Sequence, residues 1–134
     1  PAAGVLVRGG YTLLDSKVID STSSFSTVFA PGQWLLRRPR HSGFVGLAYT
    51  RARFTADLAG VFVGHRVDSD FSSLEPPILS NSGYATWDLR AAYRLVGPLS
   101  VTLAADNLAD ADYMDPLGYP ALGRAFRMGA KVGF

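Results

Sequence analysis

The chain contains no cysteine and no long apolar run, and each absence narrows what it can be. Without cysteine among its 134 residues, a disulfide framework and a thiolate metal site are excluded. Without a run of about 18 apolar residues, a transmembrane helix is excluded. The compartment stays open, because a chain without cysteine suits an oxidising environment as well as a reducing one.

Charge is also scarce, since Asp, Glu, Lys and Arg make up only 18% of the residues and the net charge is +2. That balance is too small to argue for a nucleic-acid partner. The composition is 48% hydrophobic, which is not that of a disordered chain, and the length fits one domain. The chain begins with Pro1 rather than Met and has no signal peptide, so we expect a fragment or a processed piece.

Helical periodicity is nearly absent, and period-two alternation takes its place. In residues 86–95, for example, Trp87, Leu89 and Tyr93 share one parity, whereas Asp88 and Arg90 share the other. This alternation predicts β-strands. Six such segments occur, over residues 4–15, 41–50, 54–68, 86–95, 99–106 and 126–134.

The connections between these segments alternate in length. Residues 51–53 and 96–98 are tight turns, whereas 16–40, 69–85 and 107–125 are long. In an up-and-down antiparallel sheet, all tight turns then lie at one end of the strands and all long loops at the other.

Alternation alone fits a soluble sandwich with its apolar face inward or a transmembrane barrel with that face outward. Three features favour the barrel: the loop asymmetry, segments of about ten residues, and an aromatic girdle of Tyr49, Tyr93 and Phe134 near the tight turns. We therefore predict an all-β, antiparallel meander of about six transmembrane strands. Single-chain barrels start at about eight strands and open edges in lipid cost several kcal/mol per backbone group, so the chain is an oligomeric barrel or part of a larger one.

The last third of the chain carries the most specific pattern. An Asn-Leu-x-Asp-x-x-Tyr run is followed by a Gly-Tyr-Pro…Gly-Arg stretch and a final aromatic residue. The residues are Asn107, Leu108, Asp110, Tyr113, Gly118, Tyr119, Pro120, Gly123, Arg124 and Phe134. With these residues, and with "LLRRPRHSG" upstream, the chain resembles the carboxy-terminal part of TonB-dependent outer-membrane receptors, especially the vitamin B12 and siderophore receptor group.

The resemblance implies that residues 1–134 are the C-terminal portion of a barrel of about 22 strands, without the plug domain that fills such barrels. It implies the outer membrane of a Gram-negative bacterium and uptake of a scarce nutrient such as a ferric siderophore or cobalamin, for which this fragment alone is not competent. The implied partners are the nutrient ligand, the plug, TonB, the barrel-assembly machinery, and membrane lipid with lipopolysaccharide. The alternative is a small or oligomeric outer-membrane barrel with a structural or adhesive role.

Candidate functional residues follow from the resemblance and from the pattern. The resemblance implies that the alternating residues Phe126, Met128, Val132 and Phe134 form the signal read by the assembly machinery, although they also fit a purely lipid-facing role. Tyr113 and Tyr119 are candidate apical-loop contacts to the ligand, or residues that pack the loop.

Each group of charged side chains has a structural interpretation as well as a functional one. The charged residues at the polar alternating positions are expected to form a solvated lumen wall or a surface that docks the plug. They are Arg8, Asp57, Asp88, Arg90, Arg94, Asp106, Arg127 and Lys131. Asp110, Asp112 and Asp115 fit exposed turns better than a calcium loop, because their spacing matches no defined motif. The basic run Arg37, Arg38, Arg40 and His41 fits lipopolysaccharide phosphates or a solvated strand end.

Little in the sequence supports catalysis or metal binding by this chain. His41 and His65 lie on different predicted strands, so we predict no metal site and no cofactor. An outer-rim enzyme built on His65 with Asp68 or Asp70 is the third interpretation, but no nucleophile motif such as G-x-S-x-G accompanies these residues. We therefore expect no enzyme.

Overall fold

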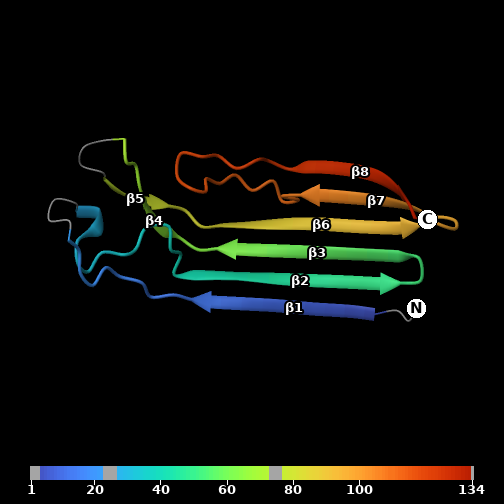
Figure 1. The fold of residues 1–134 in the computed structure, drawn as a ribbon, viewed down its shortest axis with the longest axis horizontal. Coiled ribbons are helices and arrows are strands. Elements are labelled where there is room, and N and C mark those ends of the chain that lie inside the picture. The colour runs from blue at the N-terminus through green and yellow to red at the C-terminus, as the bar shows by residue number, and fades with distance from the viewer. Residues whose placement is uncertain (1–3, 23–26, 73–76, 134) are drawn as a thin grey trace.

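The computed structural model describes residues 4–22, 27–72 and 77–133, and one antiparallel sheet dominates it (Figure 1). The sheet has six strands in the order β1-β2-β3-β6-β7-β8. They are β1 (Gly4–Leu13), β2 (His41–Arg51), β3 (Phe54–Val63), β6 (Tyr84–Arg94), β7 (Leu99–Asp106) and β8 (Ala125–Val132). The predicted all-β meander is confirmed, and β7 has the bounds expected from the sequence.

The two ends of the sheet differ as the connection lengths predict. The β2–β3 and β6–β7 turns lie together at the right of Figure 1, and the long connections gather at the left. The tight turns use left-handed backbone, with φ of 50° at Ala52 and 54° at Gly97. The long connections hold a short 3-10 helix, η1 (Thr27–Phe29), and a separate two-stranded sheet of β4 (Arg66–Ser69) and β5 (Ile78–Asn81).

The strand register places all apolar alternating positions on one face. Paired residues share a face, so one row crosses the whole sheet. That row is Val7, Leu47, Leu58, Leu89, Ala105 and Phe126. The neighbouring row on the other face carries the charged residues Asp57, Arg90 and Arg127. The predicted separation of apolar and polar parity is therefore confirmed.

The apolar face has no second layer over it among the described residues. Among the described residues the buried apolar ones are Val28, in η1, and Ala105, in β7, whereas Val7 on this face is 66% exposed and Met128 86% exposed. A soluble sandwich would bury such a face against another sheet, but a membrane barrel turns it to lipid. Tyr49 and Tyr93 lie on this face near the tight turns, as expected of a girdle; Phe134 lies outside the described residues.

No helix in the described ranges is long and apolar enough to cross a membrane.

The third predicted strand was too long. The strand predicted over residues 54–68 ends at Val63, and Gly64 N–H donates to His41 O at 2.8 Å, where β2 begins. Beyond that point β2 offers no further partner, so residues 66–69 leave the main sheet and pair with residues 78–81. The expected loop of residues 69–85 thus contains half of a hairpin that the sequence analysis missed.

Candidate functional site

The long-loop end of the sheet is organised around the carboxylate of Asp68, which is fully buried in the β4–β5 hairpin. Its Oδ1 accepts hydrogen bonds from Arg37 Nε and Ser69 N, both at 2.8 Å, and its Oδ2 accepts one from Leu117 N at 3.0 Å. Burial alone would raise the pKa of Asp68, but these hydrogen bonds and the Arg37 charge outweigh it and lower the pKa below its ordinary value. One side chain therefore ties the hairpin to two other long connections.

Arg66 is the second buried charge of this end, and its side chain is only 2% exposed. Its Nη2 donates to Met114 O at 3.0 Å and pairs with Asp115 Oδ1 at 3.0 Å, and its guanidinium lies 5.5 Å from the Tyr84 ring centre. Its Nη1 is buried and has no hydrogen-bond partner. Because a buried charged donor without a partner costs free energy, this atom is the place where an additional acceptor would be most favourable.

Two stacked tyrosines fix the 107–124 loop above the polar face. Tyr84 and Tyr113 have ring centres 3.8 Å apart and nearly parallel planes. Tyr84 Oη also donates to Asp115 Oδ2 at 2.7 Å, and Asn81 Nδ2 donates to Met114 O at 3.1 Å. The loop is therefore held on β4, β5 and β6 by an ion pair, hydrogen bonds and stacking together.

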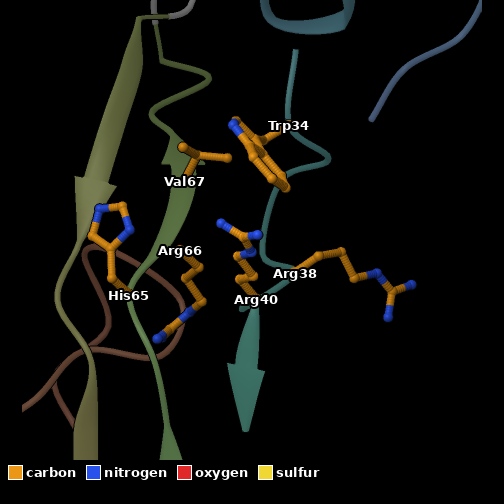
Figure 2. Close-up of a pocket in the computed structure, with 6 residues that line it drawn as sticks. All are labelled: Trp34, Arg38, Arg40, His65, Arg66 and Val67. Atoms are coloured by element: carbon orange, nitrogen blue, oxygen red, sulfur yellow. The ribbon is translucent and has the colours of Figure 1, made fainter. Parts of the chain in front are cut away.

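A pocket of about 240 Å³ opens beside this network (Figure 2). Its lining contains three arginines, a histidine and a tryptophan but no carboxylate: Trp34, Arg38, Arg40, His65, Arg66 and Val67. Figure 2 shows the Arg40 guanidinium pointing toward Trp34, from which it lies 5.9 Å, whereas Arg38 points away from the other five. Lys17 Nζ lies 4.9 Å from the same indole ring. The pocket therefore presents positive charge and an aromatic wall.

The family-type motif turns out to build the loop. Asn107 has a positive φ of 47°, and its Nδ2 donates to Ala111 O at 2.9 Å and Leu122 O at 3.3 Å while its Oδ1 accepts from Ala111 N at 2.9 Å. Asp110 Oδ1 accepts from Arg124 N at 2.8 Å, and the two side chains pair at 3.7 Å. The side chains of Asn107 and Asp110 are thus bonded inside the loop.

The remaining motif residues differ in exposure. Leu108 N donates to Trp87 O at 2.7 Å, and Gly118 has a positive φ of 86°. Tyr119 is 70% exposed, whereas Tyr113 is engaged by Tyr84. Tyr119 therefore has a free ring face for a ligand, and Tyr113 packs the loop in this conformation.

The predicted basic run is divided among three settings. Arg37 pairs with Asp68, Arg38 and Arg40 line the pocket, and His41 lies on the apolar face, where its Nδ1 meets Tyr11 Oη at 2.5 Å.

The described residues show no arrangement that supports an enzyme active site or a metal site. His65 Nε2 meets Ser80 Oγ at 2.8 Å, Asp68 is bound to Arg37, and Asp70 accepts from Ser72 N at 2.9 Å. Asp110 and Asp115 pair with different arginines, and within residues 4–22, 27–72 and 77–133 no three potential ligands come together to hold a metal ion.

On the polar face, charged residues of β6, β7 and β8 neutralise one another. Asp106 pairs with both Arg90 and Arg127, and Asp88 Oδ1 accepts from Asn107 N at 2.9 Å. On the opposite face, the predicted assembly-signal residues Phe126, Met128 and Val132 are all exposed on β8. Phe134, the fourth, lies outside the described residues.

Two features of this end are not predicted from the sequence. They are Asp68 as a buried anchor, where the sequence suggests only a partner of His65, and Trp34 as the aromatic wall of the pocket. The one available signal was local: Trp34 precedes the arginine run by a few residues, and an aromatic next to several arginines favours stacking.

Comparisons with known proteins agree with this geometry. Residues 4–108 match the family described as TonB dependent receptor-like, beta-barrel. The structure is similar to the ferric-catecholate import receptor Fiu of E. coli K12, with a TM-score of 0.75 and 21% identity over 97% of this chain and 19% of that one. It is also similar to the copper transporter OprC, with a TM-score of 0.54 and 20% identity over 72% of this chain and 17% of that one. The chain therefore spans less than a fifth of these receptors.

Proposed function

The chain belongs to the TonB-dependent receptor β-barrel family, and from that membership we propose that it forms the C-terminal portion, residues 1–134, of a barrel that imports an anionic metal chelate of the ferric-siderophore class. The family resides in the outer membrane of Gram-negative bacteria, so the polar face of the sheet lines the lumen and the long loops face outward. Members of this family are receptors, and the activity is binding and uptake rather than covalent catalysis.

The observation that carries the ligand class is the pocket of Figure 2. Its lining holds three arginines and no carboxylate. Arginine pairs bidentately with planar anionic oxygens, and Trp34 offers a stacking face for an aromatic ring. These features favour an anionic, aromatic chelate of the catecholate type. The structural likeness to a ferric-catecholate importer points the same way.

The other partners are proposed from the family. The plug domain and the segment that meets TonB lie in parts of the receptor other than this chain. The polar alternating residues that line the lumen contact the plug. Phe126, Met128, Val132 and Phe134 present the assembly signal to the barrel-assembly machinery. Lipid covers the apolar face, and lipopolysaccharide phosphates meet basic side chains at the outer rim.

A binding experiment on the complete receptor tests the ligand class. The probes are a trianionic ferric tris-catecholate and a neutral ferric hydroxamate of similar size. Arg40→Gln removes one charge from the pocket, and losing one charge-assisted hydrogen bond, about 1.5–3 kcal/mol, predicts roughly 10- to 100-fold weaker binding of the catecholate only. The matched control is Arg51→Gln, at the last residue of β2 beside a tight turn and far from the pocket. Equal binding of both probes, or no effect of Arg40→Gln, would refute the proposal.

A further inference from the structure

A second pocket lies between the end of β5 and the 107–124 loop, next to the basic pocket of Figure 2. Its volume is about 260 Å³. The two pockets adjoin because His65 Nε2, in the lining of the first, meets Ser80 Oγ, in the lining of the second, at 2.8 Å. None of the residues that line the second pocket is basic, and its hydrogen-bonding side chains are Ser80, Asn81, Ser82, Asp112 and Tyr113.

Hydrogen bonds hold the walls of this second pocket in place. Asn81 Nδ2 donates to Met114 O at 3.1 Å, which ties β5 to the loop. Leu117 N donates to the buried carboxylate of Asp68 at 3.0 Å. The turn after β5 is closely packed as well, because a side chain on Gly83 would lie 2.7 Å from a backbone oxygen of β3. The pocket is therefore already formed, and a ligand does not have to order its walls.

Three polar side chains of the second pocket are free to bind a ligand. Asp112, Ser82 and Tyr113 form no side-chain hydrogen bond or ion pair with any residue in the described ranges. Asp112 differs in this respect from Asp110 and Asp115, the other carboxylates of the loop, each of which pairs with an arginine. The pocket therefore offers one strong acceptor and two hydroxyl groups that both donate and accept.

Apolar surface lies beside these polar groups. Met114 and Leu117 line the same pocket, together with the side chain of Tyr113. A ligand that fits must therefore carry several hydroxyl groups and also present C–H surface. A hexopyranose ring does both, because its hydroxyl groups project from its edge and its ring carbons carry hydrogens on each face.

Charge selects a neutral ligand over an ion. The carboxylate of Asp112, which lines the second pocket and has no ion-pair partner in the described part of the chain, repels an anion. The adjoining basic pocket opposes a cation, because its lining contains three arginines and no carboxylate and the field of such a cluster extends over the neighbouring surface. A neutral ligand experiences neither repulsion.

We propose that the second pocket binds one neutral hexopyranose unit of a saccharide. Asp112 accepts from the sugar hydroxyl groups, Ser82 bonds a further one, and Met114 and Leu117 cover a face of the ring. The proposal goes beyond the proposed function and does not rest on it, because the two pockets have no lining residue in common. A free sugar and the core saccharide of lipopolysaccharide share this chemistry, and the experiment below distinguishes these two sources.

Ligand-observed NMR on the complete receptor, in a detergent without a sugar headgroup, tests the site. The probes are methyl α-D-glucopyranoside and methyl β-D-galactopyranoside, and ethanolammonium and acetate serve as the cationic and anionic comparisons. Saturation transfer to at least one glycoside is expected. Asp112→Ala should weaken its binding roughly 10- to 100-fold, because a charge-assisted hydrogen bond is lost, and Ser82→Ala should weaken it about 2- to 10-fold.

The matched control is Asp70→Ala. Asp70 and Asp112 are both exposed, but Asp70 lines neither pocket, so its substitution should leave glycoside binding unchanged. No transfer to either glycoside, unchanged binding in Asp112→Ala, or stronger binding of either ion would overturn the proposal.

Competition by lipopolysaccharide identifies the source of the sugar. Displacement of the glycoside by lipopolysaccharide with a complete core, but not by lipid A alone, assigns the site to the core saccharide. Displacement by neither assigns it to a free saccharide, and both outcomes support the saccharide site. Displacement by lipid A, whose sugars are phosphorylated and acylated, would show that the pocket accepts a charged headgroup and would overturn the proposal.

Discussion

Replacing Asp68 by Asn should loosen the outward loops while the membrane sheet stays intact. The amide has nearly the size of the carboxylate, so the cavity is preserved. Its single oxygen can still accept from Arg37 and Ser69, but its NH₂ group then faces the Leu117 N–H, because Asp68 bonds that donor through the other oxygen. One donor therefore loses its acceptor, and the ion pair becomes a neutral contact.

The magnitude follows from these contacts. An unsatisfied buried donor costs about 1–3 kcal/mol, and the lost charge adds about 1 kcal/mol because the Arg37 side chain is 49% exposed and keeps much of its hydration, for a total of about 2–4 kcal/mol. At about 1.4 kcal/mol per factor of ten, amide exchange in peptides containing Ser69 and Leu117 should accelerate about 30- to 1,000-fold. Hydrogen–deuterium exchange of the detergent-solubilised receptor measures this directly.

The control is Asp70→Asn, two residues away in the same connection. Asp70 is exposed, and its carboxylate accepts one hydrogen bond, from Ser72 N. Its substitution should change local stability by no more than about 0.5 kcal/mol. Equal exchange at Leu117 in the two variants would refute the reasoning, because it would show that Asp68 does not hold the 107–124 loop.

Three further predictions test other parts of the structure. The pKa of Asp68 is lowered in the folded protein, so the stability that this carboxylate contributes is complete above its ordinary pKa of about 3.9 and is lost as the pH falls through the lowered pKa. Pepsin cleavage of the outward loops should therefore rise only below about pH 3.9. Cleavage of Asp68→Asn should show no such rise, because its loops are already loose at about pH 5. Asn107→Ala removes three hydrogen bonds and places alanine at a positive φ, for about 2–4 kcal/mol, and should admit protease at the 107–124 loop while β6 and β7 stay protected. Gly60→Ala puts a methyl group 2.6 Å from the Trp87 ring, so Trp87 must move, and its fluorescence quenching by brominated lipid should change while that of Trp34, in the outward loops, does not.

The sheet itself could be predicted because every strand obeys one long-range constraint. A strand in a barrel wall must turn one parity to lipid and the other to the lumen over its full length, so eight to eleven residues repeat the same signal. The tight turns then set the register, since Arg51 pairs with Phe54 and Arg94 with Ser100 across them. Both faces were assigned from these patterns alone.

The outward end could not be predicted because its strands and contacts obey no such period. β4 and β5 have four residues each, too few for alternation to distinguish them from the end of β3. The contacts of Asp68 reach across 31 residues to Arg37 and 49 residues to Leu117. Local patterns carry no information about which loop residues meet after the strands have been arranged.

The most specific motif and the candidate ligand pocket lie in different segments of the chain. The side chain of Asn107 bonds Ala111 and Leu122, and Asp110 bonds Arg124, so the motif encodes a shape of the 107–124 loop that any ligand class can share. Trp34 and Arg40, in contrast, come from the long connection between β1 and β2, and they present their ring and charge to the pocket. The motif therefore sets the shape of one loop, whereas we expect the choice of ligand to depend on Trp34 and Arg40 of the connection between β1 and β2. Exchanging residues 14–40 between two family members should transfer ligand preference more fully than exchanging residues 107–124, in which exposed Tyr119 is the candidate ligand contact.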